Sequence, residues 1–109
     1  MLDQKDDPWQ VFDLHRLLES RKDADVSFQE FLNVESMHCG LYHLKQGSKD
    51  MQTPHDEDEM YYVIEGRAKL RVGGTEQEVT PGTFLYIKAS EDHAFFEIEQ
   101  DMTLLVVFA

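Results

Sequence analysis

The sequence is short of cysteine and of long apolar runs, and both shortages exclude classes of protein. Cys39 is the only cysteine among 109 residues, so no disulfide can form within the chain. We therefore expect a reducing, cytoplasmic location. No stretch approaches the roughly 20 consecutive apolar residues that a transmembrane helix needs. Residues 1–8 form a polar leader, so we also expect no signal peptide.

Basic residues are scarce as well. Ten Lys and Arg stand against 22 Asp and Glu, which gives a formal net charge of −12. A surface this acidic repels phosphate groups, so we expect neither nucleic acid nor an anionic membrane as a partner. Hydrophobic residues make up 41% of the chain, which is enough for a packed core. The length suits one domain, expected to span residues 1–109.

The apolar pattern predicts one short helix followed by β-strands. Residues 11–21 have helical spacing with Asp13 as a plausible N-cap, within an N-terminal extension of residues 1–25. About eight short strands follow, predicted at residues 26–34, 37–44, 59–65, 68–72, 75–79, 83–88, 94–98 and 103–108. Gly73-Gly74 predicts a tight hairpin, and Gly66 is expected to end a strand. Such a series is typical of an all-β antiparallel sandwich or barrel.

The sequence suggests a metal site formed by three residues, His55, Glu59 and His93. His55 and Glu59 lie four residues apart, so they share one face of an extended strand. If the fold brings His93 to the same point, two imidazoles and one carboxylate surround one divalent metal ion. Two histidines and a carboxylate leave open positions, which suits non-haem Fe(II) and also Mn, Ni or Zn.

These residues belong to two motifs whose spacing resembles that of a small single-domain cupin. The matching positions of the two motifs are Gly47, His55, Glu59, Gly66, Gly82 and His93. The resemblance covers roughly residues 35–109. It implies an antiparallel double-stranded β-helix, the jelly-roll barrel of RmlC-like cupins, with a metal inside the barrel. It also implies a small-molecule ligand or substrate and a homodimer.

The chain departs from the cupin pattern at several positions. Thr53 stands where the first motif has its first histidine, which removes one of the four usual metal ligands. The nearby Gln52 is the candidate for a fourth, weaker ligand. The Pro, Gly and Asn of the second motif are replaced by Lys88, Ser90 and Glu97. The segment Gln-x-Pro-His-x-Glu-Asp-Glu resembles that of a subset of small bacterial cupins.

Other residues leave alternatives open at this stage. Glu57 shares the strand face of Glu59 and is a rival carboxylate ligand. His38 and His43 fall on opposite faces of one predicted strand, so one of them is a candidate to line the cavity. Tyr61 also shares the face of Glu59, where it is either a core aromatic residue or a catalytic proton donor.

Apolar residues suggest a pocket wall and an interface. An aromatic wall of the cavity is expected from Phe84, Tyr86 and Phe95. Trp9 is expected to plug the barrel or to contact a second copy. Residues 26–34 are the candidate for a strand exchanged or added in a homodimer, since pairing covers exposed strand edges.

Two main functions fit these residues. The first is a metal-dependent cupin that acts on a small organic molecule, as an oxygenase or as an isomerase or lyase, with dioxygenase-like chemistry slightly favoured by the ligand set. The alternative is a non-enzymatic ligand-binding or sensory cupin with a degenerate metal site. A third interpretation is a structural barrel whose role is dimerisation.

Overall fold

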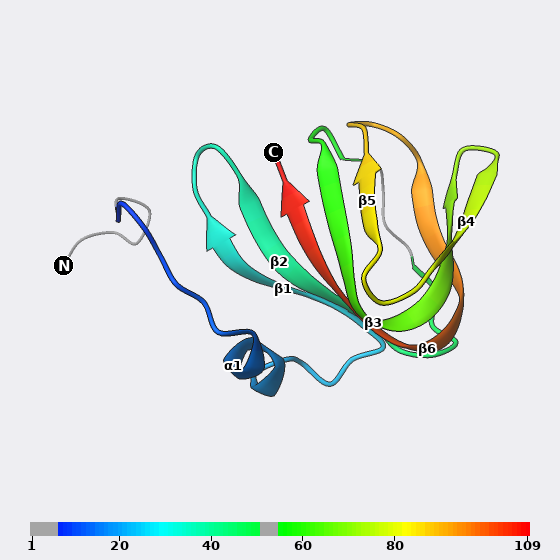
Figure 1. Cartoon of the computed structure of the whole chain (residues 1–109), viewed down its shortest axis with the longest axis horizontal. Coiled ribbons are helices and arrows are strands. Elements are labelled where there is room, and N and C mark those ends of the chain that lie inside the picture. The colour runs from blue at the N-terminus through cyan, green and yellow to red at the C-terminus, as the bar shows by residue number, and fades with distance from the viewer. Residues whose placement is uncertain (1–6, 51–54) are drawn as a thin grey trace.

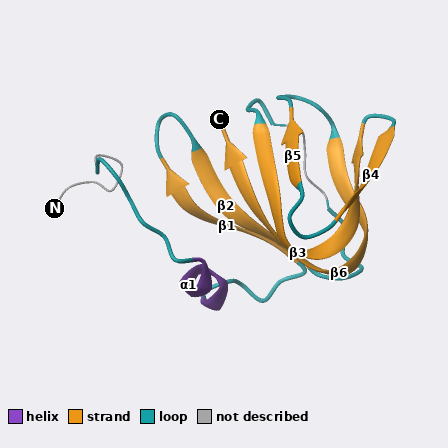
Figure 2. Ribbon diagram, viewed as in Figure 1, coloured by secondary structure: helices purple, strands orange, loops and turns teal. Residues whose placement is uncertain are grey.

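The computed structural model describes residues 7–50 and 55–109, and over them the chain forms one helix and six strands (Figure 1). The elements in chain order are α1 (Leu14–Glu19), β1 (Val26–Asn33), β2 (His38–Leu44), β3 (Glu59–Val72), β4 (Thr75–Val79), β5 (Phe84–Ile87) and β6 (His93–Phe108). All strand pairs are antiparallel. The predicted all-β fold with a short N-terminal helix is therefore confirmed (Figure 2).

Helix α1 is shorter than the pattern of residues 11–21 predicts. It begins after Asp13, whose side chain accepts a hydrogen bond from the Arg16 amide at 3.2 Å, as expected of an N-cap. It ends at Glu19, and the hydroxyl of the C-cap residue Ser20 donates to the Leu17 carbonyl. Within the described residues, no helix is both long and apolar enough to cross a membrane.

The strands form one sheet with the order β1-β2-β6-β3-β4, and β5 also pairs with β3. β3 and β6 run side by side over most of their length, from Glu59↔Phe108 at one end to Val72↔His93 at the other. The sheet curls, so that β4 and the first half of β6 face β1 and β2 across the interior (Figure 1). The predicted Gly73-Gly74 hairpin is present, because Val72 pairs with Thr75 across it.

The structure has two continuous strands where the sequence predicts two pairs of strands. Gly66 does not end β3; it has a φ of 97° and sits where the pairing with β6 shifts register between Val63 and Lys69. Glu97 on β6 also has a positive φ, of 46°. Irregular residues of this kind let a strand bend sharply while its pairing continues on either side. The barrel corners are therefore formed within the strands.

The hydrophobic core fills the inner face of the curled sheet. Side chains at alternate positions on β3 and β6 are almost fully buried there, including Tyr61, Val63 and Leu104. On β2, Gly40 leaves room for the Phe28 ring, which a Cβ atom would overlap. A larger residue at this position would therefore displace Phe28.

Candidate functional site

Glu59 is a carboxylate buried at the start of β3. It is only 2% exposed, and its neighbours across the sheet are Ile87 and Phe108. An ionised carboxylate away from water is costly unless cationic or hydrogen-bonding groups surround it. The groups around Glu59 must therefore compensate its buried charge.

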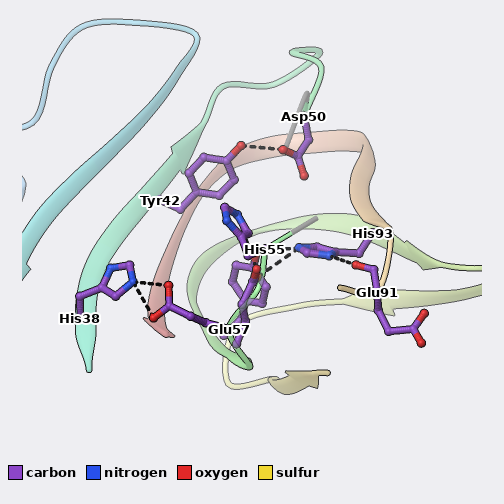
Figure 3. Close-up of polar contacts among 9 residues, drawn as sticks. His38, Tyr42, Asp50, His55, Glu57, Glu91 and His93 are labelled. Carbon is purple, nitrogen blue, oxygen red and sulfur yellow. Dashed lines mark hydrogen bonds and ion pairs between the residues drawn. The ribbon is translucent and has the colours of Figure 1, made fainter. Parts of the chain in front are cut away.

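His93 is the first of these partners. It begins β6, is 4% exposed, and its Nε2 lies 3.2 Å from Glu59 Oε2. Its Nδ1–H donates to the Glu91 carbonyl at 2.9 Å, and Figure 3 shows this contact on the far side of the ring. The carbonyl can only accept, so it fixes the proton on Nδ1 and directs Nε2 toward Glu59.

His55 approaches the same carboxylate from the other side. Its Nε2 lies 3.6 Å from Glu59 Oε1, and its side chain is 37% exposed. Its ring meets the Phe108 ring at an interplanar angle of 67°, with centroids 5.1 Å apart, and its carbonyl accepts a hydrogen bond from the Ser90 amide. Glu59 thus lies between two imidazoles, of which only His55 is accessible to solvent.

Glu59 and His93 shift each other's pKa toward the charged forms. Burial raises the pKa of Glu59, but hydrogen bonds from His93 and Tyr61 and the charge of the two imidazoles outweigh it, so the pKa lies below its ordinary value. Burial lowers the pKa of His93, but the Glu59 carboxylate and the Glu91 carbonyl outweigh it, so that pKa is raised. Each shift therefore favours the charged form of its group, the carboxylate of Glu59 and the imidazolium of His93.

Tyr61 lies two residues beyond Glu59 on the same inner face. Its ring is fully buried and meets Phe95 edge to face, with centroids 5.3 Å apart. Its hydroxyl lies 3.1 Å from His93 Nε2. Tyr61 is therefore a core aromatic residue whose hydroxyl contacts His93, and its role as a proton donor stays a prediction.

The donor set fits a divalent transition metal, but the ligands are not assembled around one point. Glu59 Oε2 is buried and has no hydrogen bond of good geometry, although His93 Nε2 is within 3.2 Å. Two imidazole nitrogens and a carboxylate suit Fe, Mn, Ni or Zn. Across residues 7–50 and 55–109, however, no three His, Cys, Asp or Glu side chains are placed to hold a metal ion together. Gln52, the predicted fourth ligand, lies outside the described residues.

The profile of the cupin domain family matches residues 40–108 of this chain. The chain belongs to the cupin family. It is 38% identical to an uncharacterized protein of Streptomyces coelicolor over 99 residues, which are 91% of this chain and 94% of that protein.

Two solved structures have a similar fold. The protein TT1209 from Thermus thermophilus superposes with a TM-score of 0.77 at 29% identity, covering 93% of this chain and 97% of that one. A protein from Rhizobium leguminosarum superposes with a TM-score of 0.78 at 18% identity, covering 92% and 95% of the two chains. At 18% identity the second likeness shows the fold alone.

Glu57 of this cupin turns away from the Glu59 group. Its two carboxylate oxygens lie 2.9 and 3.0 Å from His38 Nε2, and Figure 3 shows the pair beside the site. The His38 ring stacks on Phe108 with centroids 4.5 Å apart, and its Nδ1 lies 3.2 Å from a Glu30 oxygen. His38 therefore borders the interior next to His55, while Glu57 holds the loop that carries His55.

Two aromatic residues expected in the cavity wall lie elsewhere. Phe84 and Tyr86 on β5 are 69% and 64% exposed, so they project from the outer face of the sheet. Phe95 alone of the three is inside, 1% exposed and packed on Tyr61. The expectation was wrong for Phe84 and Tyr86 because strand pairing, which decides which face is interior, cannot be read from β5 alone.

Asp50 makes buried polar contacts that the sequence does not predict. The Tyr42 hydroxyl donates to Asp50 Oδ1 at 2.6 Å, and Asp50 Oδ2 accepts from the Phe95 amide at 2.9 Å. Burial and the adjacent carboxylate raise the pKa of Tyr42, so its hydroxyl stays protonated. Asp50 thereby connects β2 to β6 through hydrogen bonds. Its position in an irregular polar segment gave no pattern from which to predict this role.

His43 lies on the outer side of the sheet, and not in the barrel interior. It borders a polar hollow of about 480 Å³ together with Arg21 and Glu65, among others. Its Nε2 lies 3.3 Å from the Gln29 side-chain oxygen and its Nδ1 lies 3.4 Å from the Thr103 hydroxyl. Burial and the Arg21 charge lower its pKa, and Glu65 only partly opposes them.

This pKa shift predicts a specific dependence of stability on pH. Because the pKa of His43 is lower in the folded chain than the 6.5 of an ordinary histidine, the unfolded chain binds its proton first as the pH falls. The free energy of unfolding should therefore decrease as the pH drops through about 6.5, the ordinary pKa of histidine in the unfolded chain. The decrease between about pH 7.5 and 5.5, measured by urea unfolding, should be smaller in His43→Gln. Equal decreases in both proteins would contradict the prediction.

Proposed function

We propose that His55, Glu59 and His93 bind a divalent transition metal, and that the cupin uses this centre to bind and transform a small organic molecule. The observation that carries the proposal is a buried carboxylate flanked by two imidazole Nε2 atoms, with one carboxylate oxygen lacking a good hydrogen bond. Nε2 of both histidines and the Glu59 carboxylate would be the ligands. The metal would supply Lewis acidity or a redox centre.

The surrounding residues have separate tasks in this proposal. The Glu91 carbonyl keeps His93 in the tautomer whose Nε2 faces the centre. His55 is the only exposed member, so the small molecule enters from its side, past Phe108 and His38. The Tyr61 hydroxyl, beside His93, would hold or transfer a proton. His55 must move toward the other two ligands when metal binds, since the three are not assembled.

The reaction type is argued from the ligand residues, because one fold supports many reactions. His55, His93 and Glu59 would hold the metal, and a donor set of two histidines and one carboxylate suits oxygen chemistry, which favours an oxygenase over an isomerase or lyase. Turnover assays with and without dioxygen distinguish these classes.

The direct test is elemental analysis of protein expressed in metal-supplemented medium. We expect about one equivalent of a first-row transition metal per chain, removable by a chelator. Less than about a tenth of an equivalent, together with no uptake on titration of the apoprotein with Fe(II), Mn(II), Ni(II) or Zn(II), would refute the metal site.

A metal-free binding module is the second candidate. It is favoured by the contacts between Glu59, His93 and Tyr61, which already compensate much of the buried charge without a metal. In that case, a small ligand would bind with the same affinity before and after chelation, and His55→Ala would weaken it. Under the leading proposal, chelation abolishes ligand binding.

Tyr61→Phe separates the role of the hydroxyl from that of the metal ligands. Tyr61 lies beside His93 but is not proposed as a ligand, so this variant should retain the metal content of the wild-type protein. Its free energy of unfolding should be lower by about 1–2 kcal/mol, because the buried contacts of the hydroxyl with His93 and Glu59 are lost. Metal analysis and urea unfolding check both points, and a large loss of metal would show that the hydroxyl itself is needed for binding.

A further inference from the structure

The polar hollow beside His43 shares no residue with the group formed by His55, Glu59 and His93. Its volume of about 480 Å³ is within the range of small-molecule pockets. The connector between α1 and β1 forms one wall, and the ends of β2 and parts of β3 and β6 form the others. The charged lining residues are the cations Arg21, Lys22 and Lys45 and the anions Asp23, Glu65 and Asp101. In a chain of net charge −12, this lining is therefore balanced in charge.

Two buried polar side chains form the floor of the hollow. His43 is 7% exposed and Thr103 is 1% exposed, whereas the charged residues around them are exposed. The Thr103 hydroxyl donates its hydrogen to Glu65 Oε1 at 2.9 Å. The oxygen of the same hydroxyl lies 3.4 Å from His43 Nδ1. Glu65 and His43 therefore both adjoin a single hydroxyl hydrogen.

The other side of the imidazole fixes its tautomer. Gln29 donates both hydrogens of its side-chain amide, to the Leu17 carbonyl at 2.7 Å and to the Ser20 hydroxyl at 2.9 Å. The amide oxygen, which can only accept, is thereby directed toward His43 Nε2 at 3.3 Å. A neutral His43 therefore carries its proton on Nε2, which leaves Nδ1 as an acceptor. Burial and the Arg21 charge lower the pKa of His43, so the neutral form prevails at neutral pH.

The floor of the hollow consequently lacks one hydrogen-bond donor. Glu65 Oε1 and His43 Nδ1 both accept, and Thr103 has one hydrogen to donate. Arg21 does not supply the second, because its Nη1 lies 4.0 Å from Glu65 Oε1, which is beyond hydrogen-bonding distance. An ammonium group bound at Glu65 would take the place of the Thr103 hydroxyl there. The hydroxyl could then rotate and donate to His43, so that every acceptor is satisfied.

We infer that this hollow binds a free α-amino acid, with its ammonium group at Glu65 and its carboxylate at Arg21. Arginine binds carboxylates through two parallel N–H groups, and the Arg21 side chain is 52% exposed beside a carboxylate it does not hydrogen-bond. Lys45 is less available, since its Nζ already donates to Asp23 at 2.7 Å. A ligand with negative charge alone would be repelled by the acidic residues of the lining. A zwitterion offers one group to each partner and leaves the balance of charge unchanged.

The test is a titration of the full chain with each standard L-amino acid, followed through the NMR signals of the His43 ring. At about 10 mM amino acid, a site with a dissociation constant of about 1 mM or lower is mostly occupied, and its signals should shift. For the amino acid that binds most tightly, the decarboxylated amine and the acid without the amino group should each bind at least about 10-fold more weakly, because each loses one charge-assisted contact.

Matched arginine variants locate the site. Arg21→Gln should lower the affinity for the same amino acid at least about 10-fold. Arg67→Gln is the control, since the Arg67 side chain is 48% exposed and also faces a carboxylate, Glu78 at 3.0 Å, but does not line the hollow. Its affinity should equal that of the wild type. Both arginines are about half exposed, so both variants should fold, and an unchanged circular dichroism spectrum would verify this.

Four results would overturn the inference. The first is that no amino acid shifts the His43 signals, and the second is that the amine or the acid binds as tightly as the amino acid itself. The third is that Arg21→Gln retains the affinity of the wild type or loses no more than Arg67→Gln. The fourth is that a chelator abolishes the binding, which would place the amino acid at the proposed metal centre. Metal content is measured separately, so either proposal can fail while the other holds.

Discussion

His55→Ala and His93→Ala are each expected to lose stoichiometric metal, with affinity lowered at least about 100-fold. Loss of a residue that merely orients a metal ligand already lowers affinity about 10- to 100-fold, so removal of a ligand should cost no less. His55→Ala is the safer variant, because the His55 side chain is 37% exposed and its removal leaves the core intact. His93→Ala also leaves the buried Glu59 carboxylate without its main cationic partner, which should destabilise the protein by about 3–5 kcal/mol.

The matched control for these variants is Glu57→Gln. Glu57 lies two residues from His55 but contacts His38, so its substitution should leave the metal content unchanged. Isothermal titration of each apoprotein with Zn(II) or Mn(II) provides the measurement, and a folded circular dichroism spectrum is required of each variant. If Glu57→Gln lost the metal while His55→Ala retained it, the ligand set would be wrong and Glu57 would be the ligand.

Gly66→Ala is expected to lower the free energy of unfolding by about 3 kcal/mol or more. Gly66 has a φ of 97°, a region that residues with a Cβ atom adopt only at a cost of about 1–2 kcal/mol. A Cβ atom would also lie 2.5 Å from the Asp101 carbonyl oxygen and 2.7 Å from Met102 Cα. Both are backbone atoms of the paired strand β6, so they can move only if the corner of the barrel moves, and overpacking of this kind costs about 1–3 kcal/mol.

Two other glycines separate these contributions. Gly47 has a φ of 75° but has open space around its Cα, so Gly47→Ala should cost only about 1 kcal/mol for the backbone conformation. Gly74 has neither a positive φ nor a neighbour within 4 Å, so Gly74→Ala should change stability by less than about 0.5 kcal/mol. Urea unfolding of the three variants provides the test. Equal losses for Gly66→Ala and Gly47→Ala would show that the close approach of β6 contributes nothing.

The strands were predictable where local chemistry is strong. The Gly73-Gly74 turn and the N-cap at Asp13 both signal structure within a few residues, and both are confirmed. The continuity of β3 and β6 was not predictable, because glycine at Gly66 is equally compatible with a turn and with a bulge. The choice between them depends on β6, which is distant in the sequence but pairs with β3 on both sides of the bend.

The candidate site was predictable in part. Glu59 and His93 emerge from motif spacing, and the structure places both at the buried end of the barrel, where they contact each other. Their role as metal ligands, together with that of His55, stays a prediction. The hydrogen bond between the Phe95 amide and the Asp50 carboxylate could not be predicted, since it joins a side chain to a backbone group 45 residues away. The outward direction of Phe84 was missed because the sheet has apolar residues on both faces.

The long pairing of β3 with β6 has a consequence for how the chain folds. Its partners are far apart in sequence, and the most distant pair, Glu59 and Phe108, brings the start of β3 to the end of the chain. Closing such large loops costs entropy before the contacts form, which slows folding to the range of milliseconds to seconds. Because β2, β4 and β5 all attach to one or other of these two strands, neither half of the barrel has a complete sheet of its own. We therefore expect a single cooperative transition, with the amides at the centre of β3 and β6 the last to exchange their hydrogens.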